Sequence, residues 1–243
     1  MVAFFWIGWA VAAVPTPSID DALAMVDACP SPGECTVPCW DDAVRQTEPG
    51  PDGALQVSCW KGNRSHGPVV AWYANGQPLG VGYSHDGQPH GGAVSWHPTG
   101  KRASESTWVH GAREGVFRTW HPTGERASVG TWRNNRQDGV VRFWHPNGQL
   151  DEAVTWVDGQ PDGPMFSWHD NGELRARARF DHGQRVGRWR LWYPSGQRSV
   201  IVRFRDGRAH HLRCWEPKGS QTICPDGITA MFGRSAAGEP ATP

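Results

Sequence analysis

The stretch WHPNGQLDEAVTWVDGQPDG, residues 144–163, carries two tryptophans, each followed closely by glycine. Trp144 stands four residues before Gly148, and Trp156 stands three residues before Gly159. Each ring lies in a short segment that ends in turn-forming residues. Two such segments in 24 residues predict a unit of two strands and two turns.

The two aromatic positions return in register along most of the chain. One series, 24 residues apart, is Trp72, Trp96, Trp120, Trp144, Trp168 and Trp192. The second series, midway between them, is Trp60, Trp108, Trp132, Trp156, Phe180 and Phe204. Position 84 breaks the second series, because it is Ser84 with Tyr83 just before it. An aromatic every twelve residues or so indicates a repeat architecture.

Turn chemistry decides between helix and sheet. His-Pro-Thr-Gly at 97–100 presets φ with proline and closes with a glycine that accepts positive φ, as a hairpin requires. Glycine every few residues would cost a helix about 1 kcal/mol each. We therefore expect an all-β fold: an elongated antiparallel β-hairpin array of 24-residue units in a single curved sheet. About 13 strands at ~4.8 Å would make it ~60 Å long.

Each hairpin can bury its rings only against its neighbours, so the array needs end caps. The expected organisation is a signal peptide at 1–13, an N-terminal cysteine-containing cap at 14–59, β-hairpin repeats at 60–211, a C-terminal cap at 212–232 and a disordered tail at 233–243.

The N-terminal residues MVAFFWIGWAVAAV are apolar and end in the A-x-A spacing of a signal-peptidase site, although they lack the usual basic start. We expect cleavage after Ala12 or Ala13 and export, without a lipid anchor, to the periplasm, cell envelope or extracellular space. Just beyond, Ser18 followed by Asp21 predicts a capped helix near residues 19–28.

Six cysteines flank the repeats: Cys29, Cys35, Cys39, Cys59, Cys214 and Cys224. Their position predicts disulfides that staple the two ends. Cys214 is expected to pair with Cys224, and the other four to pair among themselves with open connectivity. Cys35-x3-Cys39 offers a competing zinc interpretation, but no second ligand pair matches it. We expect no metal and no cofactor.

The net charge is zero, which gives no reason to expect nucleic-acid binding, yet the charge is unevenly placed. Residues 20–52 hold eight acidic residues and one arginine, whereas residues 173–213 hold eleven arginines and three acidic residues. Strand alternation predicts a cationic patch of Arg175, Arg177, Arg179, Arg203 and Arg205. Expected ligands are lipid headgroups, acidic polysaccharide or an acidic protein surface, including the acidic end of another copy in head-to-tail assembly.

Motifs for catalysis are missing: G-x-S-x-G, H-E-x-x-H and a phosphate-binding glycine loop do not occur. The equivalent positions His97, His121, His145 and His169 invite a metal ladder. Two strands separate successive members by ~9.6 Å, whereas ligands of one ion must approach within ~4 Å. We interpret these histidines as surface residues that flank the turns.

The unit W-x-x-x-G-(x7)-W/F-x-x-G-x-x-x-G resembles the bacterial variant of the membrane occupation and recognition nexus (MORN) repeat, the variant found in the toxin-antitoxin system antitoxin-like repeat family. The resemblance covers nearly two thirds of the chain. It implies a β-hairpin array used for protein contacts or membrane attachment, and toxin neutralisation in the antitoxin-like branch. The signal-like start and the cysteine caps depart from an intracellular antitoxin.

These observations together predict a non-enzymatic repeat module for protein–protein interaction or scaffolding at the cell envelope. A protein partner is expected first and a membrane surface second. The alternatives are antitoxin or immunity-type neutralisation, and carbohydrate or cell-wall binding through the tryptophan ladder. Exposure of the rings separates the last alternative, because ligand platforms must be accessible and core rings must not.

Overall fold

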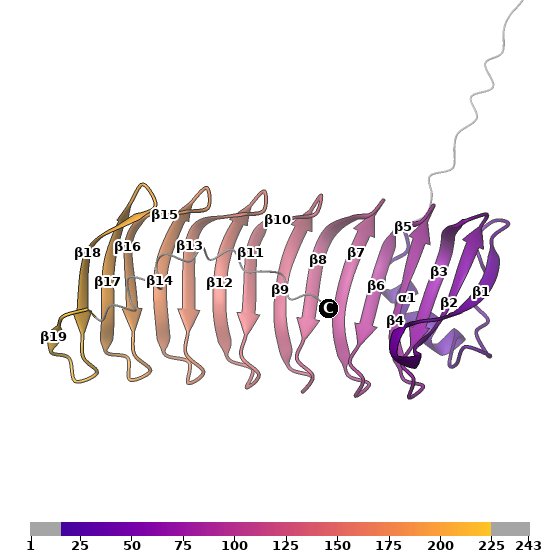
Figure 1. The fold of residues 1–243 in the computed structure, drawn as a ribbon, viewed down its shortest axis with the longest axis horizontal. Helices are drawn as coiled ribbons and strands as arrows, with labels where there is room; N and C mark the ends of the chain where they lie inside the picture. The colour runs from indigo at the N-terminus through magenta and orange to yellow at the C-terminus, as the bar shows by residue number, and fades with distance from the viewer. Residues whose placement is uncertain (1–15, 225–243) are drawn as a thin grey trace, which may run out of the picture.

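The computed structural model describes residues 16–224, in which one antiparallel sheet holds 19 strand segments. The strands form an antiparallel meander in which each long strand pairs with the long strands before and after it, and the ribbon is elongated and curved (Figure 1). The expected single curved sheet of hairpins is confirmed.

The strands of the first half are β1 (Val44–Pro49), β2 (Leu55–Lys61), β3 (Arg64–Trp72), β4 (Pro78–His85), β5 (Gln88–Pro89), β6 (Gly91–Trp96), β7 (Arg102–Val109), β8 (Ala112–Trp120) and β9 (Arg126–Arg133). Those of the second half are β10 (Arg136–Gln137), β11 (Gly139–Trp144), β12 (Leu150–Val157), β13 (Gln160–Trp168), β14 (Leu174–Asp181), β15 (Gln184–Arg185), β16 (Gly187–Trp192), β17 (Arg198–Arg205), β18 (Arg208–Trp215) and β19 (Gln221–Thr222). A short 3-10 turn, η1 (Pro51–Gly53), joins β1 to β2.

There are more segments than the 13 strands expected, for two reasons. The sheet continues past the aromatic repeats at both ends, through β1 and through β18 and β19. In addition, β5, β10 and β15 are two-residue segments that resume as β6, β11 and β16 after a one-residue break.

Two kinds of turn alternate along the sheet. In the first, the Gly124 N–H donates to the His121 carbonyl over 2.7 Å, and Gly124 takes φ +95°. In the second, Asp158 and Gly159 both have positive φ, as in the type I′ turn whose twist suits a hairpin. Equivalent pairs are His110 with Gly111, Asn134 with Asn135, His182 with Gly183 and Asp206 with Gly207.

One extra residue interrupts every second long strand. Between β8 and β9, Thr119 pairs with Ser128 and Trp120 with Arg126, which leaves Ala127 unpaired as a β-bulge. The same irregularity recurs 24 residues apart at Leu79, Ala103, Ala127, Asp151, Arg175 and Ser199. Because a bulge shifts side-chain alternation by one residue, a face assigned by counting through it is wrong.

The histidines that follow the strand-ending tryptophans join successive repeats. The Nε2–H of His97, His121, His145 and His169 donates to the carbonyl oxygen of Trp120, Trp144, Trp168 and Trp192 over 2.9, 2.8, 3.0 and 2.9 Å. Tyr73 and Tyr193 fill the same position with a hydroxyl. The interpretation of these histidines as surface residues was therefore wrong. Their side chains are half-buried and hydrogen-bond each repeat to the next.

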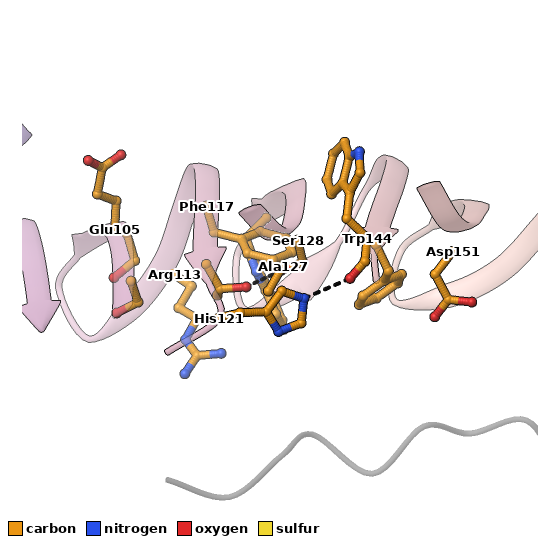
Figure 2. A pocket seen from close by; sticks show the side chains of 13 residues that line it. Glu105, Arg113, Phe117, His121, Ala127, Ser128, Trp144 and Asp151 are labelled. Atoms are coloured by element: carbon orange, nitrogen blue, oxygen red, sulfur yellow. Dashed lines mark hydrogen bonds between the residues drawn. The ribbon is translucent and has the colours of Figure 1, made fainter. Parts of the chain in front are cut away.

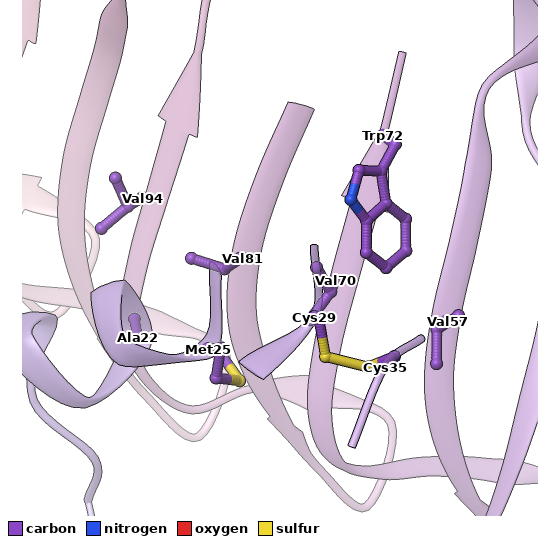
Figure 3. Packing of buried hydrophobic residues seen from close by; sticks show 9 residues of the cluster. All are labelled: Ala22, Met25, Cys29, Cys35, Val57, Val70, Trp72, Val81 and Val94. Carbon is purple, nitrogen blue, oxygen red and sulfur yellow. A yellow bond between two sulfur atoms is a disulfide. The ribbon is translucent and has the colours of Figure 1, made fainter. Parts of the chain in front are cut away.

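The predicted N-terminal helix is confirmed as α1 (Ile19–Ala28). The Asp21 N–H donates to the Ser18 hydroxyl, and the Ser18 N–H donates back to the Asp21 carboxylate. α1 lies against β4 and β6, where its buried residues complete an apolar core with strands β2, β3, β4 and β6 (Figure 3). That core comprises Ala22, Met25, Cys29, Cys35, Val57, Val70, Trp72, Val81 and Val94.

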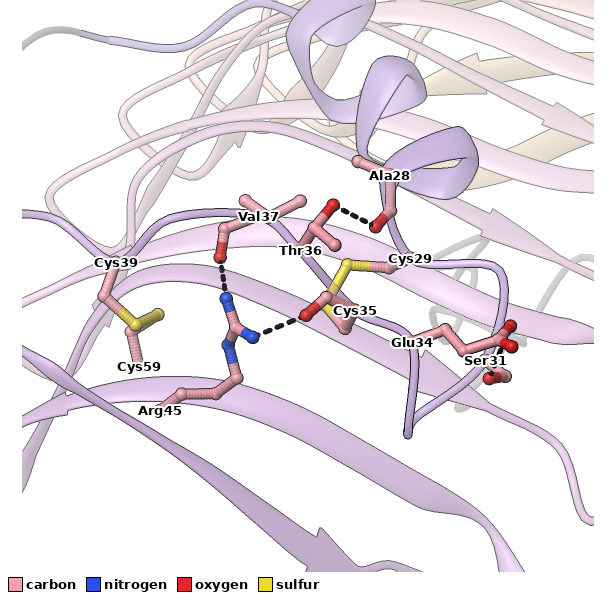
Figure 4. The surroundings of a disulfide bond; sticks show 10 residues. All are labelled: Ala28, Cys29, Ser31, Glu34, Cys35, Thr36, Val37, Cys39, Arg45 and Cys59. Atoms are coloured by element: carbon pink, nitrogen blue, oxygen red, sulfur yellow. Dashed lines mark hydrogen bonds between the residues drawn. A yellow bond between two sulfur atoms is a disulfide. The ribbon is translucent and has the colours of Figure 1, made fainter.

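Three disulfides confirm the predicted staples: Cys29 with Cys35, Cys39 with Cys59, and Cys214 with Cys224. The zinc interpretation of Cys35 and Cys39 is excluded, because each is bonded to another cysteine. The Arg45 guanidinium donates to the carbonyls of Cys35 and Val37, which holds the cap loop against β1 (Figure 4). Three disulfides are consistent with an exported protein.

The expected signal peptide at 1–13, the tail at 233–243 and the last part of the C-terminal cap lie outside the described residues. Among residues 16–224, α1 is the one α-helix, and no helix there has the length and apolarity needed to cross a membrane.

Candidate binding face

The predicted arginines lie where the sheet has a second, smaller core. In β14, β16 and β17, Ala178, Phe180, Trp189, Val202 and Phe204 form a buried cluster on one face. Residues that alternate with them must project from the other face. Those residues, hereafter the arginine face, are Arg177, Arg179, Arg188, Arg190, Arg203 and Arg205.

Strand register brings these arginines together. Arg177 of β14 is directly opposite Arg190 of β16, and Arg188 of β16 is directly opposite Arg203 of β17. Arg190 is half-buried and the other five are exposed. The patch is therefore contiguous over three strands, with β16 between the two strands that carry the predicted arginines.

Arg175 does not belong to this face, which corrects its predicted place. It is the extra residue of the bulge between β13 and β14, so strand alternation does not apply to it. Its guanidinium donates to the Asp151 carboxylate and the Ser167 hydroxyl, both over 3.2 Å. Arg175 thus neutralises the Asp151 carboxylate of the preceding repeat. Arg177, Arg179, Arg203 and Arg205 lie on the arginine face.

Sequence reasoning missed Arg188 and Arg190, which join the two predicted groups. Their signal was the run Arg188-Trp189-Arg190, a ring between two charges in strand alternation. An antiparallel meander places the strand that carries this run, β16, between β14 and β17.

The arginine face lacks charge partners among residues 16–224. None of its six guanidinium groups has a carboxylate oxygen within 4.0 Å, although Arg177 stacks on Phe166 at 5.7 Å. The middle of the sheet differs, because the Glu105 carboxylate there pairs with both Arg102 and Arg118. Unpaired charges of one sign create a local positive potential.

Two hollows open on the arginine face. The larger, about 250 Å³, is lined by Arg188, Ile201, Arg203, His211 and Arg213. The smaller, about 100 Å³, is lined by Arg203, Arg205, His210 and His211. Both are edged by guanidinium and imidazole groups, so they suit a carboxylate or another compact anion.

A row of directly opposed residues runs along this face from one end of the sheet to the other. It comprises Val81, Val94, Glu105, Arg118, Val129, Arg142, Ala153, Phe166, Arg177, Arg190, Ile201 and Arg213. α1 covers the apolar start of the row and exposes Asp20, Asp21 and Asp27. One face therefore changes sign along its length, from acidic helix to arginines.

The opposite face carries a hollow of about 510 Å³ at mid-sheet (Figure 2). Phe117 and Trp132 meet edge to face there, with ring centroids 5.8 Å apart. The hydroxyls of Thr119 and Ser128 hydrogen-bond to each other over 2.6 Å. These lining groups are occupied by contacts with each other, so we interpret the hollow as a groove between packed side chains and not as a ligand site.

The tryptophan ladder is largely part of the packing. Trp72 is 1% exposed, the other five rings of its series are half-buried, and Phe180 and Phe204 of the second series are buried. Guanidinium groups cover several rings, as where Arg113 lies 5.0 Å from the Trp108 centroid and 5.1 Å from that of Trp132. Rings stacked in this way serve cohesion between repeats.

Comparison with known proteins identifies the repeat itself. The family described as MORN repeat variant matches residues 137–158, which contain Trp144 and Trp156. The chain thus carries a MORN-type repeat. The match names the repeat and not the antitoxin-like family. No curated protein matches the chain.

Proposed function

We propose that the protein is a non-enzymatic binding module whose arginine face contacts an acidic protein surface. The observation that carries the proposal is the pair of directly opposed arginines, Arg177 with Arg190 and Arg188 with Arg203, with no carboxylate within 4.0 Å among the described residues. Like charges directly opposite each other destabilise a sheet. No carboxylate of the described residues offsets this repulsion, so we attribute the arrangement to a ligand.

The chemistry of arginine favours a protein partner. A guanidinium group presents a planar fork that binds carboxylates through two hydrogen bonds, whereas lysine is a point charge. The arginine face contains no lysine. A rigid sheet that displays six such forks in fixed register suits a surface of aspartates and glutamates, and an anionic membrane is the second candidate.

A second copy of the chain is one candidate for the acidic partner. Asp20, Asp21 and Asp27 lie exposed on α1, on the same face as the arginines but at the far end of the sheet. Two copies with these faces together and their long axes reversed would bring each acidic helix to the other's arginines. Such a contact is isologous, so it would close as a dimer.

The test compares two triple variants with the same charge change. Arg177→Gln/Arg188→Gln/Arg203→Gln removes half of the arginine face. Arg64→Gln/Arg136→Gln/Lys218→Gln removes three exposed charges elsewhere. Binding of a labelled glutamate-rich peptide and of vesicles with or without an anionic lipid would be measured over a salt series, with sedimentation for self-association.

We expect wild type and the control triple to bind the acidic peptide with strongly salt-dependent affinity, and the arginine-face triple to bind more weakly with a flatter salt dependence. Binding to anionic vesicles alone would move the assignment to the membrane. Equal losses in both triples would show that only net charge matters and would contradict the proposal.

A further inference from the structure

Four histidines gather where the N-terminal cap meets the first repeats. The ring of His66 lies beside that of His85, with centroids 4.8 Å apart. The ring of His90 lies beside that of His110, with centroids 4.7 Å apart. His85 links the two pairs at 5.7 and 5.9 Å. None of these histidines belongs to the series that joins successive repeats through tryptophan carbonyls.

Three side chains at this point have the separation of metal ligands. One ligand atom from each of His66, His85 and Asp86 lies within 4.8 Å of the other two. The His66 Nδ1 atom lies 3.2 Å from the Asp86 carboxylate, and the His85 Nδ1 atom lies 3.8 Å from it. Ligands at about 2.1 Å from a tetrahedral ion are roughly 3.4 Å apart, so small side-chain rotations would bring these atoms onto one ion.

The strands make this arrangement. Gly67 of β3 is directly opposite Ser84 of β4, so the adjacent residues His66 and His85 face each other across the hairpin. Asp86 follows at once in the left-handed region, with φ +50°, at the turn that ends β4. The register of one hairpin therefore sets all three groups.

A fourth residue orients the buried ligand. The His66 side chain is 7% exposed, and its Nε2 atom lies 3.4 Å from the Asp41 carboxylate. The His66 Nδ1 atom lies 3.2 Å from the Asp86 carboxylate and 3.5 Å from the Asp86 backbone nitrogen, and an ion bound to Nδ1 would replace the contact with that backbone N–H. A proton on Nε2 leaves the Nδ1 lone pair toward His85 and Asp86. Metal-bound histidines usually donate their other ring N–H to a carboxylate, a backbone carbonyl or water, and Asp41 is placed for that role.

We propose that His66, His85 and Asp86 bind a divalent transition-metal ion, with Asp41 as the residue that positions His66. Two imidazoles and one carboxylate suit Zn²⁺, and the exposed Asp86 leaves the fourth position open to water. This site differs from the predicted absence of metal and is independent of the arginine face.

The ion would fasten the cap to the sheet. Asp41 belongs to the loop after Cys39, and the neighbouring Trp40 stacks on Tyr83 of β4 with centroids 5.6 Å apart. Lys61 of β2 also reaches this loop, through the Asp42 carboxylate at 2.8 Å. A metal ion bound by His66 of β3 and by His85 and Asp86 at the end of β4 would also connect, through the His66–Asp41 contact, to the loop of the cap. Metal binding would therefore stabilise the folded state.

A second group, Asp162, Asp181 and His182, provides a matched control. Its members also lie within 4.8 Å of one another, but it has a single imidazole on an exposed turn, and the His182 side chain is 84% exposed. Side chains free to move in solvent do not preorganise a site. His182→Ala therefore removes a cluster histidine without touching the proposed site.

The test uses the full chain with its disulfides intact, stripped with chelator and titrated with Zn²⁺ by calorimetry and by thermal unfolding, with Ca²⁺ and Mg²⁺ for comparison. Co²⁺ in place of Zn²⁺ would report ligand geometry through its visible absorption. The variants are His85→Ala, Asp86→Asn, Asp41→Asn and His182→Ala. Because Asp86 is exposed, Asp86→Asn changes a ligand without opening a cavity beside the buried His66.

We expect one Zn²⁺ per chain and a raised unfolding temperature. His85→Ala and Asp86→Asn should each weaken binding by at least tenfold, and Asp41→Asn by roughly 10–100-fold. His182→Ala should bind as wild type. No binding to wild type, a response to Ca²⁺ equal to that for Zn²⁺, or a loss confined to His182→Ala would each overturn the proposal.

Discussion

The Nε2–H of His121 donates to the carbonyl oxygen of Trp144 over 2.8 Å, one repeat further along the chain (Figure 2). The bond joins two turns that are not neighbours in sequence. Because Tyr73 and Tyr193 make the same contact with a hydroxyl, the position requires a donor of suitable reach and not an imidazole.

We therefore expect His121→Tyr to keep near wild-type stability and His121→Phe, which has a ring without a donor, to lose about 1 kcal/mol. Denaturant unfolding followed by tryptophan fluorescence would measure the difference. Equal stability of the two variants would show that ring volume, not the hydrogen bond, supports the turn.

Arg188→Glu should raise stability while it weakens binding. The new carboxylate would lie directly opposite Arg203, so a repulsive cross-strand pair becomes attractive, a gain of about 0.2–1 kcal/mol. Thermal unfolding and peptide binding on the same samples would test both halves. A variant that loses stability would mean that the opposed arginines are supported within the fold by contacts that substitution disrupts.

Gly92→Ala should lift the start of α1 from the sheet. A Cβ atom at Gly92 would lie 2.3 Å from the Ser18 carbonyl oxygen, and the Gly92 N–H donates to the Pro17 carbonyl over 2.7 Å. The cap must shift, at a cost of about 1–3 kcal/mol. Hydrogen exchange in α1 should rise. Gly33→Ala, where a Cβ would meet open space, is the control and should leave exchange unchanged.

Glu152→Gln should change how stability depends on pH. Burial raises the pKa of the Glu152 carboxyl, Asp151 raises it further and Arg175 opposes both. A raised pKa means that the folded state keeps a proton that the unfolded state has released. Stability should therefore fall as pH rises above the ordinary glutamate range. The variant should lose that decline and be the more stable protein at neutral pH. Parallel pH profiles from unfolding titrations would contradict this assignment.

Reduction of the disulfides should loosen the ends before the middle. Cys214 with Cys224 holds β19 to β18, and the other two pairs hold the N-terminal cap, whereas β8 to β13 have neighbours on both sides. In an array stabilised by nearest neighbours, a lost cap exposes only the next strands. Hydrogen exchange on Cys214→Ser/Cys224→Ser should increase in β17 and β18 and stay unchanged in β8 and β9. A uniform increase would indicate a cooperative sheet.

The sequence was sufficient for those features that depend on local chemistry. Gly124 and its equivalents need positive φ, and the spacing of Trp144 and Trp156 is that of paired strands, so the hairpin array was predictable. Ser18 and Asp21 satisfy each other within one helical turn, so α1 was predictable as well. The disulfides followed from cysteines confined to the two ends.

What failed depends on register, which periodicity alone does not specify. The bulge at Arg175 displaced that side chain from the arginine face, and nothing in the run Arg175-Ala176-Arg177 marks it. The meeting of His66 with His85 likewise requires the pairing of β3 with β4. The face of the sheet that α1 covers depends on tertiary packing, because Val81 and Val94 present an apolar surface on that face.

The row from Val81 to Arg213 sets the distance between the acidic helix and the arginine face. Acidic helix and arginines are fixed at two points of one continuous sheet, and each 24-residue unit between them adds two strands, ~9.6 Å. The number of units therefore acts as a ruler for the separation of the two charged regions. A partner that touches both must match that span, and the insertion or loss of one unit would change which partner fits while every hairpin stays intact.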